Sequence, residues 1–275
     1  MDRTALVTGG NRGIGFEACR QLATAGPRVV LTARDPVRGE EAAEALRDEG
    51  LDVSFAELDV TDSGSVGACA RRLSDAGTDI DVLVNNAGVY PTEGAFQVEE
   101  ETFERALEIN TLGPFRTCRA FVPAMVRRGY GRVVNVSSGG SFGEGIGPVA
   151  YGASKAALNA LTVKVAEAAR GDVKANAMCP GWVRTDMGGA WAPPEPGAGR
   201  GHPSLARDVA PRRPQRRLLS GPQADPLVRP RAGVYLFARK TPATMTAAPI
   251  SCPGPKLSPS STMPALTPIR VTRFW

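Results

Sequence analysis

Tyr151 and Lys155, a tyrosine and a lysine four residues apart, are the pair in this sequence best suited to acid catalysis. Residues at this spacing lie on one face of a helix, one turn apart. A free tyrosine titrates near pH ~10, and a neighbouring cation lowers that pKa because it favours the phenolate. A tyrosine tuned in this way can donate a proton to a carbonyl oxygen. The alternative is a partly buried tyrosine beside a surface lysine, so the pair needs support from the rest of the chain.

Two other polar positions suggest a site. Ser138 follows an apolar run at 133–136, at the carboxyl edge of a predicted strand, where ligands bind in open α/β sheets. The alternation of a strand puts its neighbour Ser137 on the opposite side, where we expect the hydroxyl to bond to backbone. Asn110 lies within a long apolar helical region, and asparagine is a poor helix former. We therefore expect Asn110 to have a polar task.

A glycine-rich turn near the N-terminus predicts a nucleotide site. The turn, residues 8–15, reads TGGNRGIG and lies between an apolar strand at 4–8 and a helical pattern at 16–23. Gly9, Gly13 and Gly15 have no β-carbons, so the backbone can approach a pyrophosphate at the positive N-terminal end of the helix. The alternative is a tight loop, but the strand before and the helix after are the context that this motif requires.

The end of the second strand predicts which dinucleotide binds. In such folds an acidic group at this position favours NAD, and an arginine accommodates the 2′-phosphate of NADP. Arg34 follows the strand at 29–31, and Arg12 lies in the glycine turn. Both favour NADP(H). The alternatives are that both arginines are solvated, or that Asp35 binds a ribose hydroxyl.

The remaining elements alternate between strand and helix. This order predicts an α/β fold, a single Rossmann-like doubly wound parallel sheet with helices on both faces. Asp59 and Val60 follow the third strand, at the edge where adenine could bind, and a turn at 85–88 after the fourth strand lets backbone and amide groups face a cofactor. The expected strands are 4–8, 29–31, 53–58, 82–84, 133–136 and 173–178; the expected helices are 16–23, 36–49, 63–76, 103–110 with 114–128, and 151–169.

Composition fits a globular protein of 275 residues with 42% hydrophobic and 22% charged residues. Five cysteines are scattered without a Cys-x-x-Cys pair, so we expect neither a disulfide framework nor a zinc site, and a cytoplasmic location. The N-terminus lacks the apolar core of a signal peptide, and we expect no membrane span.

Taken together, the motifs from Thr8 to Asp186 resemble the short-chain dehydrogenase/reductase family. Within it, the residues at 30–35 and 58–62 are similar to those of NADPH-dependent carbonyl reductases, and Ser138 precedes Tyr151 by the family's common interval. The resemblance implies that Ser138 hydrogen-bonds the substrate carbonyl, Tyr151 donates the proton, Lys155 lowers the Tyr151 pKa and holds the nicotinamide ribose, and Asn110 positions a relay water. It also implies a homodimer or homotetramer, if the C-terminus is intact.

The cofactor-binding prediction combines these motifs with a loop after the sixth strand, in which Val183 and Thr185 match positions that contact the nicotinamide carboxamide. The predicted NADP(H)-binding residues are Gly9, Asn11, Arg12, Gly13, Ile14, Gly15, Arg34, Asp59, Val60, Asn86, Ala87, Gly88, Tyr151, Lys155, Pro180, Gly181, Val183 and Thr185. No metal site is predicted.

The composition changes after residue 190. Residues 1–190 hold 20 Lys/Arg against 25 Asp/Glu, whereas residues 191–275 hold 13 against 3 and contain 16 of the 23 prolines. We therefore divide the chain into a catalytic domain at 1–190 and an aberrant tail at 191–275. A disordered basic tail is one interpretation. Our hypothesis is a frame change in the gene, because residues 201–229 read one base later can resemble the ending of the carbonyl reductases. His202 would then have no catalytic role.

The sequence predicts an enzyme that reduces ketone, aldehyde or quinone carbonyls of small molecules with NADPH. The alternatives are a 3-oxoacyl reductase or secondary-alcohol dehydrogenase of the same family, or a catalytically impaired NADP(H)-binding protein. A nucleic-acid binder with a basic tail is the least favoured alternative; its binding should depend steeply on salt and disappear when the tail is removed.

Overall fold

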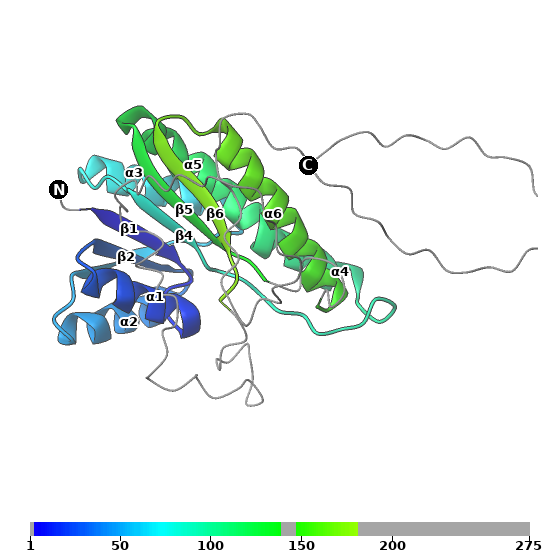
Figure 1. Ribbon diagram of the computed structural model, residues 1–275. Coiled ribbons are helices and arrows are strands. Elements are labelled where there is room, and N and C mark those ends of the chain that lie inside the picture. The colour runs from blue at the N-terminus through cyan, green and yellow to red at the C-terminus, as the bar shows by residue number, and fades with distance from the viewer. Residues whose placement is uncertain (1–2, 139–146, 181–275) are drawn as a thin grey trace, which may run out of the picture. The chain divides into compact units, whose positions relative to one another are not determined.

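Six strands form the centre of the part of the chain that the computed structural model describes, residues 3–138 and 147–180. They are β1 (Thr4–Thr8), β2 (Arg28–Ala33), β3 (Val53–Glu57), β4 (Val82–Asn85), β5 (Tyr130–Val136) and β6 (Asp172–Met178). All pair in parallel, in the spatial order β3-β2-β1-β4-β5-β6. Figure 1 labels five of these strands, from β2 to β6 in that order. The chain runs outward from β1 to β3 and then returns to β4. The boundary between β1 and β4 is therefore the switch point at which such sheets bind ligands.

The central strands are apolar on both faces. Every residue of β1 and β4 is buried, as a sheet covered by helices on both sides requires. The helices are α1 (Gly13–Thr24), α2 (Pro36–Asp48), α3 (Ser63–Asp75), α4 (Glu100–Leu107), α5 (Gly113–Arg128) and α6 (Val149–Ala168).

Two hydrophobic clusters hold the helices to the sheet, one on each face. Residues of α1 and α2, including Leu22 and Leu46, pack with Val7 and Leu31 in one cluster. Residues of α3 and α5 pack with Leu6 and other strand residues in the second cluster, which α6 also joins. Figure 1 shows the resulting layers, with α1 and α2 on one side of the sheet and α5 and α6 on the other.

A wide helical turn separates α4 from α5. Residues Glu108–Leu112 form a π-helical turn, η1, with Asn110 in its middle. Such turns are rare and frequently occur at functional sites. The sequence predicted one long helical region with a polar residue at this place, and the structure adds the change of helix type.

The predicted fold class is confirmed: strands and helices occur where they were expected, with ends that differ by a few residues. Within the described ranges, no helix has the apolar length needed to cross a membrane. The predicted boundary at residue 190 lies outside these ranges.

Candidate active site

The glycine turn lies at the switch point between β1 and β4. Gly9 has a φ of +63°, in the left-handed region, and a β-carbon there would meet the Ala87 Cα at 3.0 Å. A β-carbon on Gly15 would collide with the Gly9 carbonyl oxygen and the Asn86 amide. Only glycines allow the turn after β1, the start of α1 and the turn after β4 to approach this closely.

Hydrogen bonds join the same two turns. The Thr8 hydroxyl accepts from the backbone N–H groups of Asn86 and Ala87, at 3.0 and 3.1 Å. The Asn86 side chain donates to the carbonyl oxygens of Thr8 and Gly9, each at 3.0 Å. Both hydrogens of this amide therefore hold the glycine turn, so Asn86 supports the predicted cofactor site through the backbone of that turn.

The N-terminus of α1 fits a diphosphate. Arg12 occupies the N-cap position with extended backbone and has no side-chain acceptor for the first amides, and the first turn carries no acidic residue. A helix of 12 residues with this start presents N–H groups and the positive end of its dipole to an anion. Asn11 and Ile14 are half-buried beside it, and Arg12 is exposed.

The end of β2 separates the roles of Arg34 and Asp35. Asp35 caps α2: its Oδ1 accepts from the N–H groups of Val37 and Arg38 at 3.1 and 3.2 Å. Its other oxygen lies 3.5 Å from the Arg38 guanidinium. Arg34 is exposed at the carboxyl edge of the sheet. The Asp35 carboxylate, which could favour an unphosphorylated ribose, is thus engaged in capping α2, whereas Arg34 faces solvent.

Asp59 and Val60 are fixed at the end of β3. The Asp59 carboxylate accepts from the N–H and hydroxyl of Thr61 at 2.9 and 2.7 Å. The Val60 carbonyl accepts from Arg116 of α5 at 3.2 Å, and the Val60 side chain is buried. These contacts close a rigid turn at the position predicted for adenine.

Tyr151, Lys155 and Ser138 come together at the start of α6. Tyr151 lies in the first turn of the helix, and its side chain is hydrogen-bonded to that of Ser138. The Lys155 ammonium lies 5.7 Å from the centre of the Tyr151 ring and donates to the Val136 carbonyl at 2.7 Å. A strand end therefore anchors the lysine, and the serine that follows the same strand contacts the tyrosine.

Burial decides the direction of the Tyr151 pKa in this arrangement, and the lowering of that pKa by Lys155 stays a prediction. Burial raises the pKa of Tyr151, the hydrogen bond with Ser138 opposes that change, and Cys179 and Tyr90 add to it. Burial also lowers the pKa of Lys155 to about 8. The physical reason is that both groups are withdrawn from water, which disfavours the charged form of each.

Asn110 uses its side chain to hold the loop after β4. Its Oδ1 accepts from the Val89 N–H at 2.9 Å, and its Nδ2 donates to the Val89 carbonyl and to the Ser154 hydroxyl, at 3.0 and 2.9 Å. The side chain is completely buried. A β-carbon on Gly88 would come within 3.0 Å of the Asn110 Oδ1. Asn110 thus has the polar task that was expected, and its part in a water relay stays a prediction.

The sequence matches the family described as short chain dehydrogenase over residues 3–196. The chain belongs to the short-chain dehydrogenase/reductase family. Carbonyl reductase (NADPH) 1 of Sus scrofa is 35% identical, over 72% of this chain and 84% of that protein. The 3-oxoacyl-(acyl-carrier-protein) reductase FabG of Chlamydia pneumoniae is 31% identical, over 68% of this chain and 76% of its own.

Solved structures agree with this assignment. A gluconate 5-dehydrogenase from Burkholderia cenocepacia, in complex with NADP and tartrate, superposes with a TM-score of 0.61 at 32% identity. The match covers 64% of this chain and 70% of that one. This short-chain dehydrogenase/reductase is therefore an oxidoreductase with the fold of enzymes that use nicotinamide cofactors.

Two serines that support the site have partners that could not be read from the sequence. Ser154 was not predicted, although its hydroxyl accepts from Asn110 and donates to the Tyr151 carbonyl at 2.7 Å. Ser137 was expected to bond to backbone through its hydroxyl, but that hydroxyl donates to the Asn159 side chain at 2.7 Å. The partner of Ser137 differs from the expected one because α6 packs against the end of β5 and brings Asn159 next to this hydroxyl. The sequence around Ser137 does not reveal that contact.

A buried polar network also links the strands to the helices. Asn85 of β4 donates to Asn135 of β5 at 2.8 Å, and Asn135 donates to the Thr162 hydroxyl of α6 at 2.7 Å. The Thr117 hydroxyl of α5 donates to the Asn85 side chain at 2.6 Å. The sequence did carry a sign of this network, because Asn85 ends one apolar strand and Asn135 lies inside another.

The remaining predicted residues lie after β6, some of them within the described residues, which end at 180, and the others after it. Cys179 and Pro180 follow β6 and are half-buried, and Cys179 is near enough to Tyr151 to affect its pKa. Gly181, Val183, Thr185 and His202 lie outside the described residues, as does the whole tail.

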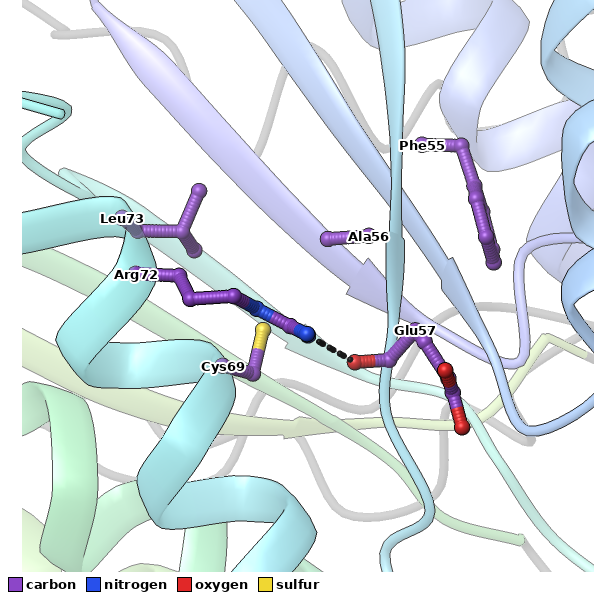
Figure 2. Close-up of a pocket in the computed structure, with 6 residues that line it drawn as sticks. All are labelled: Phe55, Ala56, Glu57, Cys69, Arg72 and Leu73. Carbon is purple, nitrogen blue, oxygen red and sulfur yellow. Dashed lines mark hydrogen bonds between the residues drawn. The ribbon is translucent and has the colours of Figure 1, made fainter.

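A cavity of about 320 Å³ lies between the edge strand β3 and helix α3. Figure 2 shows Arg72 of α3 reaching toward β3, where its Nη2 donates to the Glu57 carbonyl at 3.0 Å. The cavity contains none of the predicted site residues; its lining is Phe55, Ala56, Glu57, Cys69, Arg72 and Leu73.

Proposed function

We propose that this chain reduces ketone, aldehyde or quinone carbonyls of small molecules with NADPH, in a reaction that also runs as alcohol oxidation. The observation that carries the proposal is the contact of Ser138 with the Tyr151 side chain, one helical turn from the buried Lys155. Two groups then face one substrate oxygen, as reduction of a carbonyl requires. The carbonyl reductase relative supports the same chemistry.

Tyr151 is the proton donor in this proposal. Because burial raises the pKa of Tyr151, its hydroxyl keeps the proton at neutral pH and is available as an acid. Ser138 bonds the same hydroxyl, so a substrate oxygen that reaches Tyr151 also meets the serine. When bound, the nicotinamide cofactor supplies the hydride.

Lys155 provides the positive charge of the site. Its pKa of about 8 leaves it mostly protonated at neutral pH, and the Val136 carbonyl fixes the ammonium group. We assign two tasks to it: a hydrogen bond to the nicotinamide ribose, and electrostatic compensation of the phenolate that forms when Tyr151 gives up its proton. The second task is the same effect as the lowering of the Tyr151 pKa, because a cation that stabilises the phenolate makes loss of the proton easier.

The preference for NADPH over NADH rests on Arg34 and Asp35. An exposed arginine at the end of β2 suits a 2′-phosphate, and Asp35 is committed to capping α2. The NADP complex of the gluconate 5-dehydrogenase supports this choice. The diphosphate would lie at the start of α1, where the glycine turn leaves room for it.

A 3-oxoacyl reductase is the second candidate, because the FabG relative shares the same fold and covers a similar part of the chain. The other alternative functions are a secondary-alcohol dehydrogenase and a catalytically impaired NADP(H)-binding protein. We further propose that residues 1–190 form the catalytic unit, that the protein acts in the cytoplasm, and that it assembles as a homodimer or homotetramer.

One experiment separates these functions. The purified 275-residue chain is assayed for NADPH oxidation with a simple ketone, a quinone and an acetoacetyl thioester, and for NADP reduction with secondary alcohols. Preference for the ketone or quinone supports the proposal, and preference for the thioester supports the second candidate. NADPH binding without turnover of any of these substrates contradicts the proposal and supports the impaired binding protein.

A further inference from the structure

An aromatic side chain outside the predicted catalytic set packs against Tyr151. The rings of Tyr90 and Tyr151 have centroids 4.6 Å apart and an interplanar angle of 76°, an edge-to-face pair. Tyr90 is 40% exposed, although it is large and apolar over most of its surface. Part of the ring therefore covers Tyr151, and part faces the space outside it.

The position of Tyr90 is fixed by the same residue that supports the catalytic helix. Asn110 binds both the N–H and the carbonyl of Val89, which directly precedes Tyr90. Asn110 also donates to Ser154, whose hydroxyl donates to the Tyr151 carbonyl. One buried amide thus sets the backbone beside Tyr90 and the helical turn that carries Tyr151, so the two rings are held relative to each other.

We propose that Tyr90 is a positioning residue that selects substrates whose carbonyl carries a planar aromatic group. The inference rests on the proposed carbonyl reduction and adds the substrate class to it. An aromatic ring prefers to pack against another aromatic ring in an offset or edge-to-face arrangement, and such a pair contributes beyond its buried area. A substrate oxygen at the Tyr151 hydroxyl places its substituent near the neighbouring ring, where an aryl group gains this contact and a saturated ring gains only burial. Tyr90 acts on orientation and gives no proton.

Two variants of Tyr90 separate the aromatic ring from its hydroxyl and its bulk. Tyr90→Phe keeps the ring, while Tyr90→Leu keeps an apolar side chain without it. Phe96→Leu is the matched control, because Phe96 is an aromatic residue of the same loop that is 97% exposed. Circular dichroism and thermal unfolding verify that each full-length variant is folded; if Tyr90→Leu is not, Tyr90→Met replaces it.

The substrates are acetophenone and cyclohexyl methyl ketone, which differ in whether the ring next to the carbonyl is planar. The measured quantity is the ratio of their kcat/KM values with NADPH. We expect Tyr90→Leu to lower the preference for acetophenone about 3- to 10-fold, the range of an aromatic pair. Tyr90→Phe and Phe96→Leu should keep the wild-type ratio. A ratio unchanged in Tyr90→Leu, with both rates lowered equally, overturns the proposal and makes Tyr90 only a cover for Tyr151.

Binding provides a second readout that is independent of turnover. The affinity of the NADPH-loaded chain for each ketone is measured by ligand-observed NMR, for the wild type and for Tyr90→Leu. If neither ketone is reduced, the proposed function fails, but a selective loss of acetophenone affinity in Tyr90→Leu still supports the role of Tyr90. Equal affinities for both ketones in wild type and variant contradict it.

Discussion

Asn110 and Ser154 form a 2.9 Å hydrogen bond that joins the π-helical turn η1 to helix α6, next to Tyr151. Both side chains are completely buried, so this bond has no competition from water. The Ser154 hydroxyl in turn donates a hydrogen bond to the Tyr151 carbonyl at 2.7 Å. The orientation of the catalytic turn therefore depends on a polar contact between residues 44 positions apart.

Replacing Ser154 with alanine should weaken both folding and catalysis. The variant leaves a buried hydrogen of Asn110 without its partner, which costs about 1 to 3 kcal/mol of unfolding free energy. We expect kcat to fall while NADPH affinity stays near the wild-type value, because the glycine turn is untouched. Chemical denaturation and steady-state kinetics measure the two effects. Thr24→Ala is the control, since it removes an exposed hydroxyl bonded to the Arg20 carbonyl. Equal stability of Ser154→Ala and wild type would contradict the role of this contact.

Replacing Gly15 with alanine should damage the cofactor site. The new methyl group collides with the Gly9 carbonyl and the Asn86 amide, and overpacking of this kind costs about 1 to 3 kcal/mol. NADPH affinity, measured by fluorescence titration, should fall at least about 10-fold because the turn must move. Gly67→Ala is the matched control: it lies in α3, its β-carbon meets only the Arg71 guanidinium at 3.4 Å, and alanine favours the helix. A normal affinity in Gly15→Ala would show that the turn does not bind the cofactor.

Replacing Arg34 with aspartate should lower the proposed preference for NADPH over NADH. The variant loses a charge-assisted contact with the 2′-phosphate and places a carboxylate where a ribose hydroxyl would lie. We expect the ratio of kcat/KM for NADPH over NADH to fall about 10- to 100-fold. Arg28→Asp makes the same charge change at the opposite end of β2 and should leave the ratio unchanged. An unaltered ratio in Arg34→Asp would refute NADP(H) selection by this residue.

Lys155 should destabilise the folded protein at neutral pH. Burial lowers its pKa from 10.5 to about 8, so between these values the unfolded state binds more protons than the folded state. The unfolding free energy contributed by this group therefore rises with pH over that interval, and the penalty is complete below about pH 8.

Lys155→Met tests this account of stability. It removes the buried cation and should raise the unfolding free energy at neutral pH by on the order of 1 to 2 kcal/mol, after the loss of the bond to the Val136 carbonyl. Activity should fall strongly in the same variant. Lys164→Met, an exposed lysine of the same helix, is the control for both effects. Thermal unfolding as a function of pH measures them, and a lower melting temperature in Lys155→Met than in Lys164→Met would contradict the expected penalty.

Much of this site could be predicted from local sequence, because its main features depend on residues close together in the chain. The spacing of Tyr151 and Lys155 and the glycines of residues 8–15 each lie within one turn or helix. The missing features depend on contacts over long separations. The Thr8 hydroxyl meets the Asn86 amide 78 residues later, and nothing in either segment alone reveals that contact.

The electrostatics of the site could not be predicted for a similar reason. Lys155 next to Tyr151 in a helix suggested a lowered tyrosine pKa, but the sign depends on how deeply both groups are buried. The end of β5 supplies the Val136 carbonyl that holds the buried Lys155 ammonium, and this contact depends on how α6 packs on the sheet. The same holds for Asn110. Its residue type predicted a polar role, but its hydrogen-bond partners Val89 and Ser154 could be identified only from the folded structure.

The most direct test of the account is the activity of Tyr151→Phe in the full-length chain. This change removes one oxygen from the residue that we assign as the proton donor and leaves the ring in contact with Tyr90. With NADPH and the preferred carbonyl substrate, we expect kcat to fall about 100- to 10,000-fold, with NADPH affinity and melting temperature close to the wild-type values. Retention of most of the wild-type kcat would contradict the assignment of Tyr151 as the general acid.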